Sequence, residues 1–313
     1  MKEGLSTREA YGRALVRLGR ENKNIVALDA DLAKSTMTKL FADEFPDRFF
    51  DCGVAEQNMI GIAAGLALCG KIAFASSFAV FVPGRCYDQL RMAVAYSGAN
   101  VKIASSHAGL TVGADGASHQ AIEDVGLARS LPGFSIIVPA DEVAAAWATR
   151  VAASTFGPFY LRLGRPKSPI VYEESQTFEL GKAVLLREGR DATVVANGRM
   201  VIEALQAADL CAQEGIAVRV LDLHTVEPID RESLVAAARD TGAVVVAEEH
   251  LLEGGTGAGV AQVMAEEYPV PMEFVAIRRV FGQSGDPNDL LRRYKLTAKD
   301  IYEAVKRAVA RKK

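Results

Sequence analysis

Short apolar runs alternate with longer mixed runs along the first half of the chain. The short runs are rich in Val, Ile, Phe and Ala and predict strands at residues 25–28, 72–75, 101–104, 135–138 and 159–163. The longer runs are rich in Ala and Leu and predict helices at residues 7–20, 56–69, 85–95 and 142–153. Strands that alternate with helices in this way are typical of a parallel sheet covered by helices.

A polar stretch at residues 165–178 interrupts this pattern, and its prolines indicate a linker. A second alternation follows, with strands predicted at residues 191–196, 217–222 and 243–248 and helices at residues 199–214, 230–241 and 257–267. A chain of 313 residues suits about two domains. We therefore predict a two-domain α/β fold, with one domain at residues 1–170 and a smaller one at residues 180–313.

Composition narrows the functional classes. The net charge of −3 argues against a nucleic-acid-binding surface, which needs clustered Lys and Arg. The sequence has no apolar run near the ~20 residues of a membrane span, and its first residues form no apolar leader. We therefore expect a cytoplasmic protein with no nucleic-acid and no membrane partner.

Neither the cysteines nor the histidines are spaced like metal ligands. The four cysteines show no CxxC pair, so we expect reduced residues of the core. The four histidines are not spaced as pairs of zinc ligands. We therefore expect no metal site formed by this chain.

Glu56 is a carboxylate in an almost wholly apolar region. Phe49 and Phe50 precede it, and a run of small and apolar residues follows it at residues 59–68. Burial would disfavour the charged form and raise the pKa of Glu56, so that it could hold or pass a proton near neutrality. Two interpretations stay open from the local pattern, which are a catalytic carboxyl group and a structural Glu stabilised at the start of a helix.

A polar, glycine-rich loop at residues 105–120 follows the predicted strand at residues 101–104. It contains His107, Asp115 and His119. Loops beyond the carboxyl ends of parallel strands are where open α/β sheets bind ligands. Imidazole and carboxylate groups suit a substrate with many hydroxyls and suit proton transfer. The alternative is a connecting turn with polar caps, but long loops of this kind seldom serve only to connect.

Two further segments permit more than one interpretation. Phe78 and Phe81 follow a predicted strand and could stack on a planar ligand, although two core phenylalanines are the simpler interpretation. The glycines at residues 254–259 lack the G-x-G-x-x-G register, so we expect tight helix packing there rather than a phosphate site.

Taken together, these segments resemble the transketolase family of thiamine diphosphate enzymes. The sequence GVAEQN at residues 53–58 is similar to the motif of the family's cofactor-activating Glu, and SHAGLTVGADGASHQ at residues 106–120 is similar to its substrate loop. DADLAKS at residues 29–35 and SSFAVF at residues 76–81 follow the family order. The resemblance covers essentially the whole chain and implies a pyrimidine-binding domain followed by the family's C-terminal domain.

The resemblance also implies roles for single residues. Glu56 matches the carboxyl group that bonds N1′ of the cofactor's pyrimidine ring, and Phe81 matches the ring stacked on it, with Phe78 as its neighbour. Asp31 matches a position near the cofactor. A third aromatic residue of the family is Gly84 here, and Tyr87 is a candidate replacement.

For the substrate, the resemblance implies a sugar phosphate held by residues from several segments. His107, Asp115 and His119 match groups that bond the hydroxyls of a ketose, and His107 and His119 join Glu56 as the catalytic set. The phosphate end matches Arg8, Ser35, His107 and Arg165. The activity implied is transfer of a two-carbon ketol unit between sugar phosphates.

The chain is about half the family length and has no G-D-G metal motif. It therefore looks like the C-terminal subunit of a split transketolase, whose N-terminal partner subunit would hold the diphosphate and its Mg²⁺ or Ca²⁺ ion. We expect self-association around a twofold axis in a two-plus-two assembly. Three alternatives stay open: the β subunit of a 2-oxo acid dehydrogenase, a 1-deoxyxylulose-5-phosphate synthase fragment, and an inert binding subunit.

Overall fold

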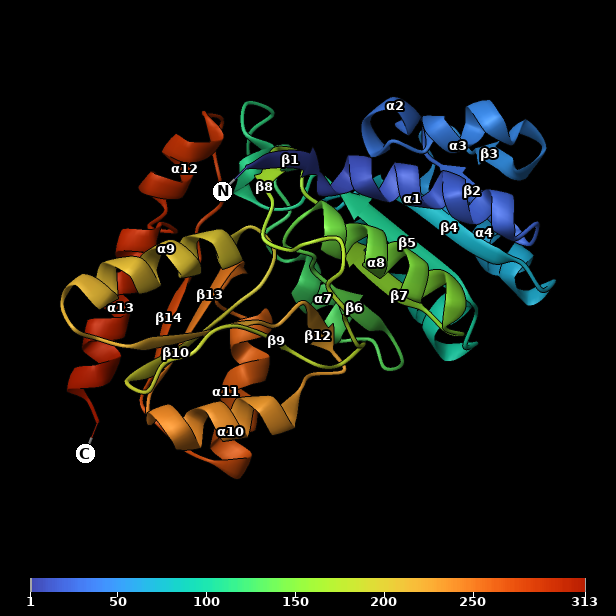
Figure 1. Ribbon diagram of the computed structural model, residues 1–313. Coiled ribbons are helices and arrows are strands. Elements are labelled where there is room, and N and C mark those ends of the chain that lie inside the picture. The colour runs from blue at the N-terminus through green and yellow to red at the C-terminus, as the bar shows by residue number, and fades with distance from the viewer. Residues whose placement is uncertain (1, 313) are drawn as a thin grey trace.

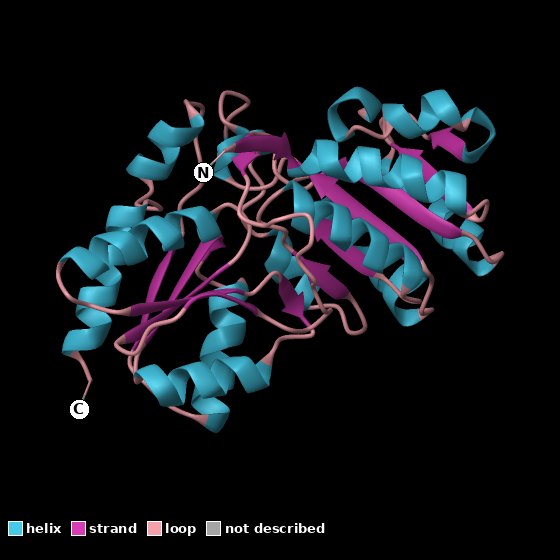
Figure 2. Ribbon diagram, in the orientation of Figure 1, coloured by secondary structure: helices cyan, strands magenta, loops and turns pink. Residues whose placement is uncertain are grey.

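The computed structural model describes residues 2–312. Figures 1 and 2 show two lobes, each built on a sheet with helices packed on it. One sheet has seven strands and the other has five, and a separate pair of short strands forms a third, small sheet. The predicted two-domain α/β fold with mostly parallel sheets is confirmed.

The first sheet has the strand order β12-β6-β7-β5-β4-β2-β3. All its neighbouring strands are parallel except β12, which is antiparallel to β6. The strands are β2 (Ile25–Asp29), β3 (Phe49–Asp51), β4 (Ile72–Phe78), β5 (Val101–Ser106), β6 (Ser135–Ile137), β7 (Phe159–Arg162) and β12 (Thr225–Glu227).

Helices cover both faces of this sheet, which explains why its strands are apolar throughout. Successive residues of β2 point to opposite faces: Ile25 and Ala27 pack with α1 (Thr7–Glu21), while Val26 and Leu28 pack with α4 (Glu56–Leu68). The other helical segments are α2 (Ala33–Thr36), α3 (Lys39–Glu44), α5 (Val82–Arg85), α6 (Tyr87–Gln89), the π-helix Leu90–Tyr96, α7 (Asp124–Arg129), α8 (Glu142–Ser154) and the 3₁₀ turns Pro46–Arg48, Leu110–Val112 and Ala117–His119.

The second sheet has the order β14-β13-β10-β11-β9, with β9 antiparallel at its edge. Its faces alternate in the same way, since Val194 packs with α9 and α13 and Val195 packs with α10 and α11. The elements are β9 (Val184–Arg187), β10 (Ala192–Ala196), β11 (Val218–Asp222), β13 (Val244–Leu251), β14 (Met272–Ile277), α9 (Met200–Gln213), α10 (Arg231–Thr241), α11 (Thr256–Glu267), α12 (Pro287–Arg293) and α13 (Ala298–Ala310).

The structure differs from the sequence prediction in several elements. The strands β1 (Glu3–Ser6), β3, β9, β12 and β14 and the helices α2, α3, α7, α12 and α13 were not predicted. The stretch predicted as a linker contains β8 (Lys167–Pro169), which pairs with β1. The helix predicted at residues 85–95 begins earlier, because Pro83 suits the first turn of α5, and it continues as the π-helix. The strand predicted to end at residue 248 continues to Leu251, since parallel pairing with β14 continues beyond residue 248.

The cysteines are all free thiols, and two of them match the predicted core location. Cys86 and Cys211 are buried, and burial raises the pKa of the Cys211 thiol to about 11. Cys52 is half-buried and Cys69 is exposed, so these two are not core residues. No helix within residues 2–312 is long and apolar enough to cross a membrane, and no group of three or more His, Cys, Asp or Glu side chains in that range is arranged to hold a metal ion.

Candidate active site

The carboxyl ends of the parallel strands of the first sheet meet at one edge, and the residues singled out in the sequence follow these ends. Asp31 and Ser35 follow β2, Glu56 follows β3, and Phe78 ends β4. The remaining candidates are Phe81 after β4, His107, Asp115 and His119 after β5, Arg165 after β7, and Arg8 in the first turn of α1. One edge of one sheet therefore carries every candidate.

Glu56 is the first residue of α4 and is buried, as the sequence predicted. Gly53 has a φ of +66°, which lets the chain turn sharply between β3 and α4. The Glu56 carboxylate accepts a hydrogen bond from Arg85, with Nη1 and Oε1 2.7 Å apart. This charged partner was not predicted from the sequence.

Phe78, Phe81, His107 and His119 form one aromatic cluster. The rings of Phe78 and Phe81 are stacked, with centroids 5.7 Å apart and planes 14° apart. The imidazole of His107 stacks on Phe78 with a centroid distance of 3.8 Å, and His119 meets Phe81 edge to face at 5.5 Å. Residues from two separate segments, after β4 and after β5, are thus brought together.

Arg85 completes this cluster from the last residue of α5. Its Cζ atom lies 4.6 Å from the centre of the Phe81 ring, in a cation–π contact. Tyr87, the candidate replacement for a family aromatic, instead directs its hydroxyl to Ser130 Oγ at 2.7 Å. The spacing of Phe81 and Arg85 by four residues was the sequence signal for this contact, because such residues share one face of a helix.

His107 is buried and adopts a left-handed backbone conformation, with a φ of +58°. Its Nδ1 lies 2.9 Å from Ser106 Oγ. Burial, and then the positive charges of Arg8 and Arg165, lower the pKa of His107 to about 3. The imidazole is therefore neutral near pH 7 and can donate or accept a hydrogen bond without carrying charge.

A group of basic and polar side chains lies beside His107. Arg8 Nη1 donates to the carbonyl of Ser35 at 2.6 Å. Arg165 Nη1 donates to the carbonyl of Val112 at 2.5 Å and lies 3.5 Å from Asp115 Oδ1. Burial and the charge of Arg165 lower the pKa of Arg8, and Arg8 Nε is buried with no hydrogen-bond partner among residues 2–312. The two guanidinium groups make this region electropositive, and Arg8 Nε is a donor without a partner among the residues described.

Asp31 lies at the exposed end of the same edge. Its backbone N–H donates to Asp51 Oδ1 at 3.1 Å, and the same oxygen accepts from the backbone N–H of Gly53. The neighbouring Asp29, which the sequence analysis did not single out, shapes this loop. Asp29 accepts hydrogen bonds from Thr36 and Thr38, and burial raises its pKa to about 6.

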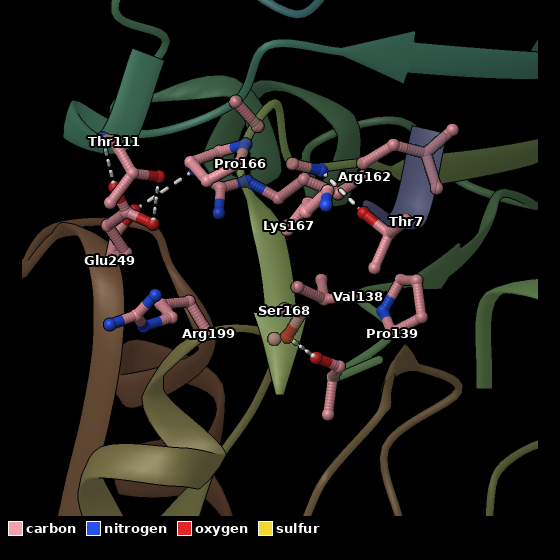
Figure 3. A pocket seen from close by; sticks show the side chains of 15 residues that line it. Thr7, Thr111, Val138, Pro139, Arg162, Pro166, Lys167, Ser168, Arg199 and Glu249 are labelled. Carbon is pink, nitrogen blue, oxygen red and sulfur yellow. Dashed lines mark hydrogen bonds between the residues drawn. The ribbon is translucent and has the colours of Figure 1, made fainter. Parts of the chain in front are cut away.

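A residue of the second lobe forms hydrogen bonds with the loop at residues 105–120. Glu249 in β13 accepts hydrogen bonds from the backbone N–H of Thr111 at 2.6 Å and from its hydroxyl at 3.3 Å. Figure 3 shows these bonds at the side of a cavity of about 50 Å³ that also contacts Arg162 and Arg199. Gly109 lies so close to Glu249 that a Cβ atom there would be 2.4 Å from the carboxyl group. The loop geometry therefore depends on both lobes.

The glycine-rich segment before α11 serves helix packing, as the sequence predicted. A Cβ atom on Gly255 would lie 2.3 Å from Glu248 Oε2, and one on Gly259 would lie 2.8 Å from Arg129 Nη2. The close approach of Gly255 to the buried, hydrogen-bonded Glu248 requires glycine, whereas the Arg129 side chain near Gly259 could shift.

Two models of known protein families together match most of the chain. The model described as transketolase, pyrimidine binding domain, matches residues 3–170, and the model described as transketolase, C-terminal domain, matches residues 181–301. The chain belongs to the transketolase family. Transketolases use thiamine diphosphate, as the sequence resemblance implied.

Among transketolase relatives, a Methanocaldococcus jannaschii protein named "Putative transketolase C-terminal section" is 45% identical, over 95% of this chain and 94% of that protein. The "6-deoxy-6-sulfo-D-fructose transketolase subunit SqwH" of a Clostridium species is 42% identical, over 97% of this chain and 95% of that protein. A solved structure described as a split gene transketolase, inactive beta4 tetramer, has a TM-score of 0.93 at 52% identity and covers 99% of this chain and 100% of that one. The chain spans 49% of the length of the Homo sapiens transketolase.

Proposed function

We propose that this chain, together with a diphosphate-binding partner chain, forms the active site of a thiamine diphosphate-dependent enzyme. The reaction is transfer of a two-carbon ketol unit between sugar phosphates. The observation that carries the proposal is the juxtaposition of a buried carboxyl group, Glu56, with the stacked Phe78 and Phe81 and the buried, neutral His107.

The site fits the pyrimidine ring of the cofactor. A flat, nitrogen-bearing group already lies on Phe81 and Glu56, because the Arg85 guanidinium contacts both. When bound, thiamine diphosphate supplies the carbanion-stabilising chemistry that protein side chains lack. Glu56 would hold or pass a proton at N1′, and the burial of its carboxyl group would strengthen that hydrogen bond. Phe78 and Phe81 would fix the plane of the ring, and Asp31 would lie near the cofactor.

His107 and His119 are assigned to the sugar. Ser106 occupies Nδ1 of His107, so Nε2 is the atom left to bond a substrate hydroxyl or carbonyl oxygen. Ser118 Oγ lies 3.0 Å from Nδ1 of His119, which leaves its Nε2 in the same way. Asp115, which is partly exposed beside Arg165, would accept a hydrogen bond from a sugar hydroxyl.

Arg8, Ser35 and Arg165 are assigned to the anionic end of the substrate. A guanidinium binds two oxygens of a phosphate at once, and Arg8 has a buried donor to spare. A sulfonate has the same arrangement of three oxygens, and the Clostridium relative is named for a sulfo-sugar. A ketose phosphate is the substrate proposed here, and a ketose that carries a sulfonate is the alternative.

A partner chain would complete the site. Six exposed large apolar side chains come from residues 50–96, near α4 and the π-helix: Phe50, Val54, Ile62, Leu68, Met92 and Tyr96. On the exposed face of α4, Cβ atoms added to Gly61 and Gly65 would meet no atom within 4 Å. An apolar surface with glycines suits a closely packed protein interface. The partner would be the N-terminal transketolase subunit, which would hold the diphosphate and its Mg²⁺ or Ca²⁺ ion.

The test is reconstitution. The chain is mixed with a candidate N-terminal subunit, thiamine diphosphate and Mg²⁺, and ketol transfer from a ketose phosphate to an aldose phosphate is measured. Activity in the mixture and none in either chain alone is expected. Oxidative decarboxylation of a 2-oxo acid by the mixture would favour the dehydrogenase alternative. Condensation of pyruvate with an aldose phosphate would favour the synthase alternative. Light scattering should give two copies of each chain, and a stable one-to-one active species would contradict the twofold assembly.

Calorimetry separates the chain's own contribution from that of its partner. With Mg²⁺ present, the chain alone should bind thiamine diphosphate weakly, because the diphosphate and metal ligands lie in the partner. Tight binding by the isolated chain would overturn the split-site proposal. A mixture that binds the cofactor but turns over no substrate would instead favour an inert binding subunit.

A further inference from the structure

Arg85 makes two contacts whose combination is informative. Its Nη1 donates to Glu56 Oε1 at 2.7 Å, and its Cζ lies 4.6 Å from the centre of the Phe81 ring. Under the proposed function, Glu56 and Phe81 are the hydrogen-bonding and stacking partners of the pyrimidine ring. Arg85 therefore makes both contacts that are assigned to the cofactor.

We propose that the Arg85 guanidinium occupies the position of the cofactor's pyrimidine ring, against Glu56 and Phe81, and that the pyrimidine ring binds by displacing it. The inference rests on the proposed function. A guanidinium is flat, delocalised and lined with N–H donors, so it can satisfy a carboxylate and a ring face together. Stacked rings lie about 4.5–7 Å apart between centroids, so the 4.6 Å separation leaves no room for another ring between Arg85 and Phe81.

The surroundings of Arg85 allow its side chain to leave while its backbone stays in place. The Arg85 carbonyl accepts a hydrogen bond from Gln57 Nε2 at 2.8 Å, which ties the end of α5 to α4. The Arg85 side chain is 49% exposed, while that of Glu56 is 5% exposed. The neighbouring Gly84 leaves space, since a Cβ atom there would meet Leu127 Cδ1 alone, at 3.8 Å. The half-exposed Arg85 side chain can thus move toward solvent without a shift of α5.

The exchange predicts an unusual salt dependence. The binding of a neutral pyrimidine is not helped by long-range electrostatic attraction. The pyrimidine must, however, first break the ion pair between Arg85 and Glu56. Salt weakens an ion pair whose cation is partly exposed. The affinity for a neutral pyrimidine should therefore rise as salt is added.

The experiment titrates the full-length chain with 4-amino-5-hydroxymethyl-2-methylpyrimidine, the neutral pyrimidine half of thiamine, by ligand-detected NMR. Arg85→Ala should bind this probe about five- to thirtyfold more tightly than the wild type, which is the combined strength of an ion pair and a cation–π contact. Its affinity should not change with NaCl. Arg85→Lys, which keeps the charge and loses the plane, should fall between the two.

Arg91→Ala is the matched control. Arg91 lies in the π-helix, is exposed and contacts Met92, so its removal changes the net charge equally without touching Glu56 or Phe81. It should bind the probe as the wild type does, with the same salt dependence. A gain equal to that of Arg85→Ala would show a general charge effect and would overturn the exchange.

Two variants separate this inference from the proposed function. Glu56→Gln and Phe81→Ala should weaken probe binding when combined with Arg85→Ala. If they do so, and Arg85→Ala alone binds no more tightly than the wild type, the exchange is wrong and the pyrimidine site stands. If they change nothing, or if no variant binds the probe, both the pyrimidine site and the exchange are wrong.

Discussion

Glu56 and Glu248 are buried glutamates near the carboxyl edges of two parallel sheets, and they are held in different ways. Glu56 has a side chain as its partner, the half-exposed Arg85. Glu248 accepts hydrogen bonds from the backbone N–H groups of Thr256 and Gly257, at 2.7 and 2.9 Å, in the first turn of α11. A side-chain partner can rotate away and be exchanged for a ligand, whereas backbone N–H groups in the first turn of a helix are held in place by the helix.

Other polar groups at the two edges differ in exposure, since those of the second sheet have buried side chains as partners and Arg85 of the first sheet is half-exposed. In the second sheet, the hydroxyl of Tyr172 donates to Asp222, whose pKa is raised to about 7 by burial, and Asn197 donates to Thr256. In the first sheet, imidazole, phenyl and guanidinium groups gather around Glu56 and His107 instead. Polar residues at strand ends therefore mark a site when their partners are replaceable, and their mere presence does not.

The largest effect is expected at Glu56. Glu56→Gln should lower ketol transfer by the reconstituted enzyme about 10²- to 10⁴-fold while the fold is kept, because an amide can bond N1′ but cannot pass a proton to it. Steady-state turnover and a thermal melt of the same preparation are the measurements. Near wild-type turnover would show that Glu56 is structural, like Glu248.

The next largest effect concerns the substrate end. Arg165→Ala should raise KM for phosphorylated donors about ten- to a hundredfold, because a phosphate far from the reacting carbon is bound alike in the ground and transition states. An unphosphorylated donor such as hydroxypyruvate should be affected much less. His119→Ala is the counterpart and should lower kcat for both donors. Equal losses for both donors in Arg165→Ala would contradict the phosphate assignment and support the 2-oxo acid alternative.

At Glu248, the expected effect is on stability alone. Glu248→Gln should lower the free energy of unfolding by about 1–3 kcal/mol, because one of two buried backbone donors loses its acceptor. Turnover per folded enzyme should not change. Glu266→Gln, a surface change in the same helix, should leave the denaturation midpoint where it was. A loss of turnover in folded Glu248→Gln would break the distinction drawn between the two glutamates.

The smallest effect is a pH dependence of stability. The pKa of His107 is lowered to about 3 in the folded chain, so the unfolded chain binds a proton first as the pH falls below its ordinary value of 6.5. Stability from this group is full above pH 6.5 and is lost as the pH falls toward 3. At pH 5.5 the loss is up to about 1.4 kcal/mol. His107→Asn should reduce the difference in unfolding free energy between pH 7 and 5.5, and His224→Asn, whose pKa is lowered to about 4, should add to this. An unchanged slope in both variants would contradict the prediction.

Much of the fold followed from the sequence because apolar periodicity and helix signals act locally. Five strands of the first sheet were predicted, among them β2 and β5, which are buried on both faces. The three-residue strands β3 and β12 were missed, because so few residues carry little pattern. The pairing of β1 with β8 was missed, because three or four residues with few apolar side chains carry little pattern. The burial of Glu56 followed from its neighbours, whereas its pairing with Arg85 depends on how α4 and α5 pack. The hydrogen bond from Thr111 to Glu249 joins residues that are 138 positions apart, so no local sequence pattern predicts it.

One strand crosses the boundary that the sequence suggests between the two lobes. β12, from the second half of the chain, extends the first sheet by pairing with β6, through Thr225 with Ile137 and Glu227 with Ile136. A fragment cut at residues 170–180 would expose the edge of β6, and unpaired edges promote aggregation. The division of the sequence at the linker is thus not the division between the two sheets. A chimera that exchanges the second lobe for a relative's should be joined after β12 rather than at the linker.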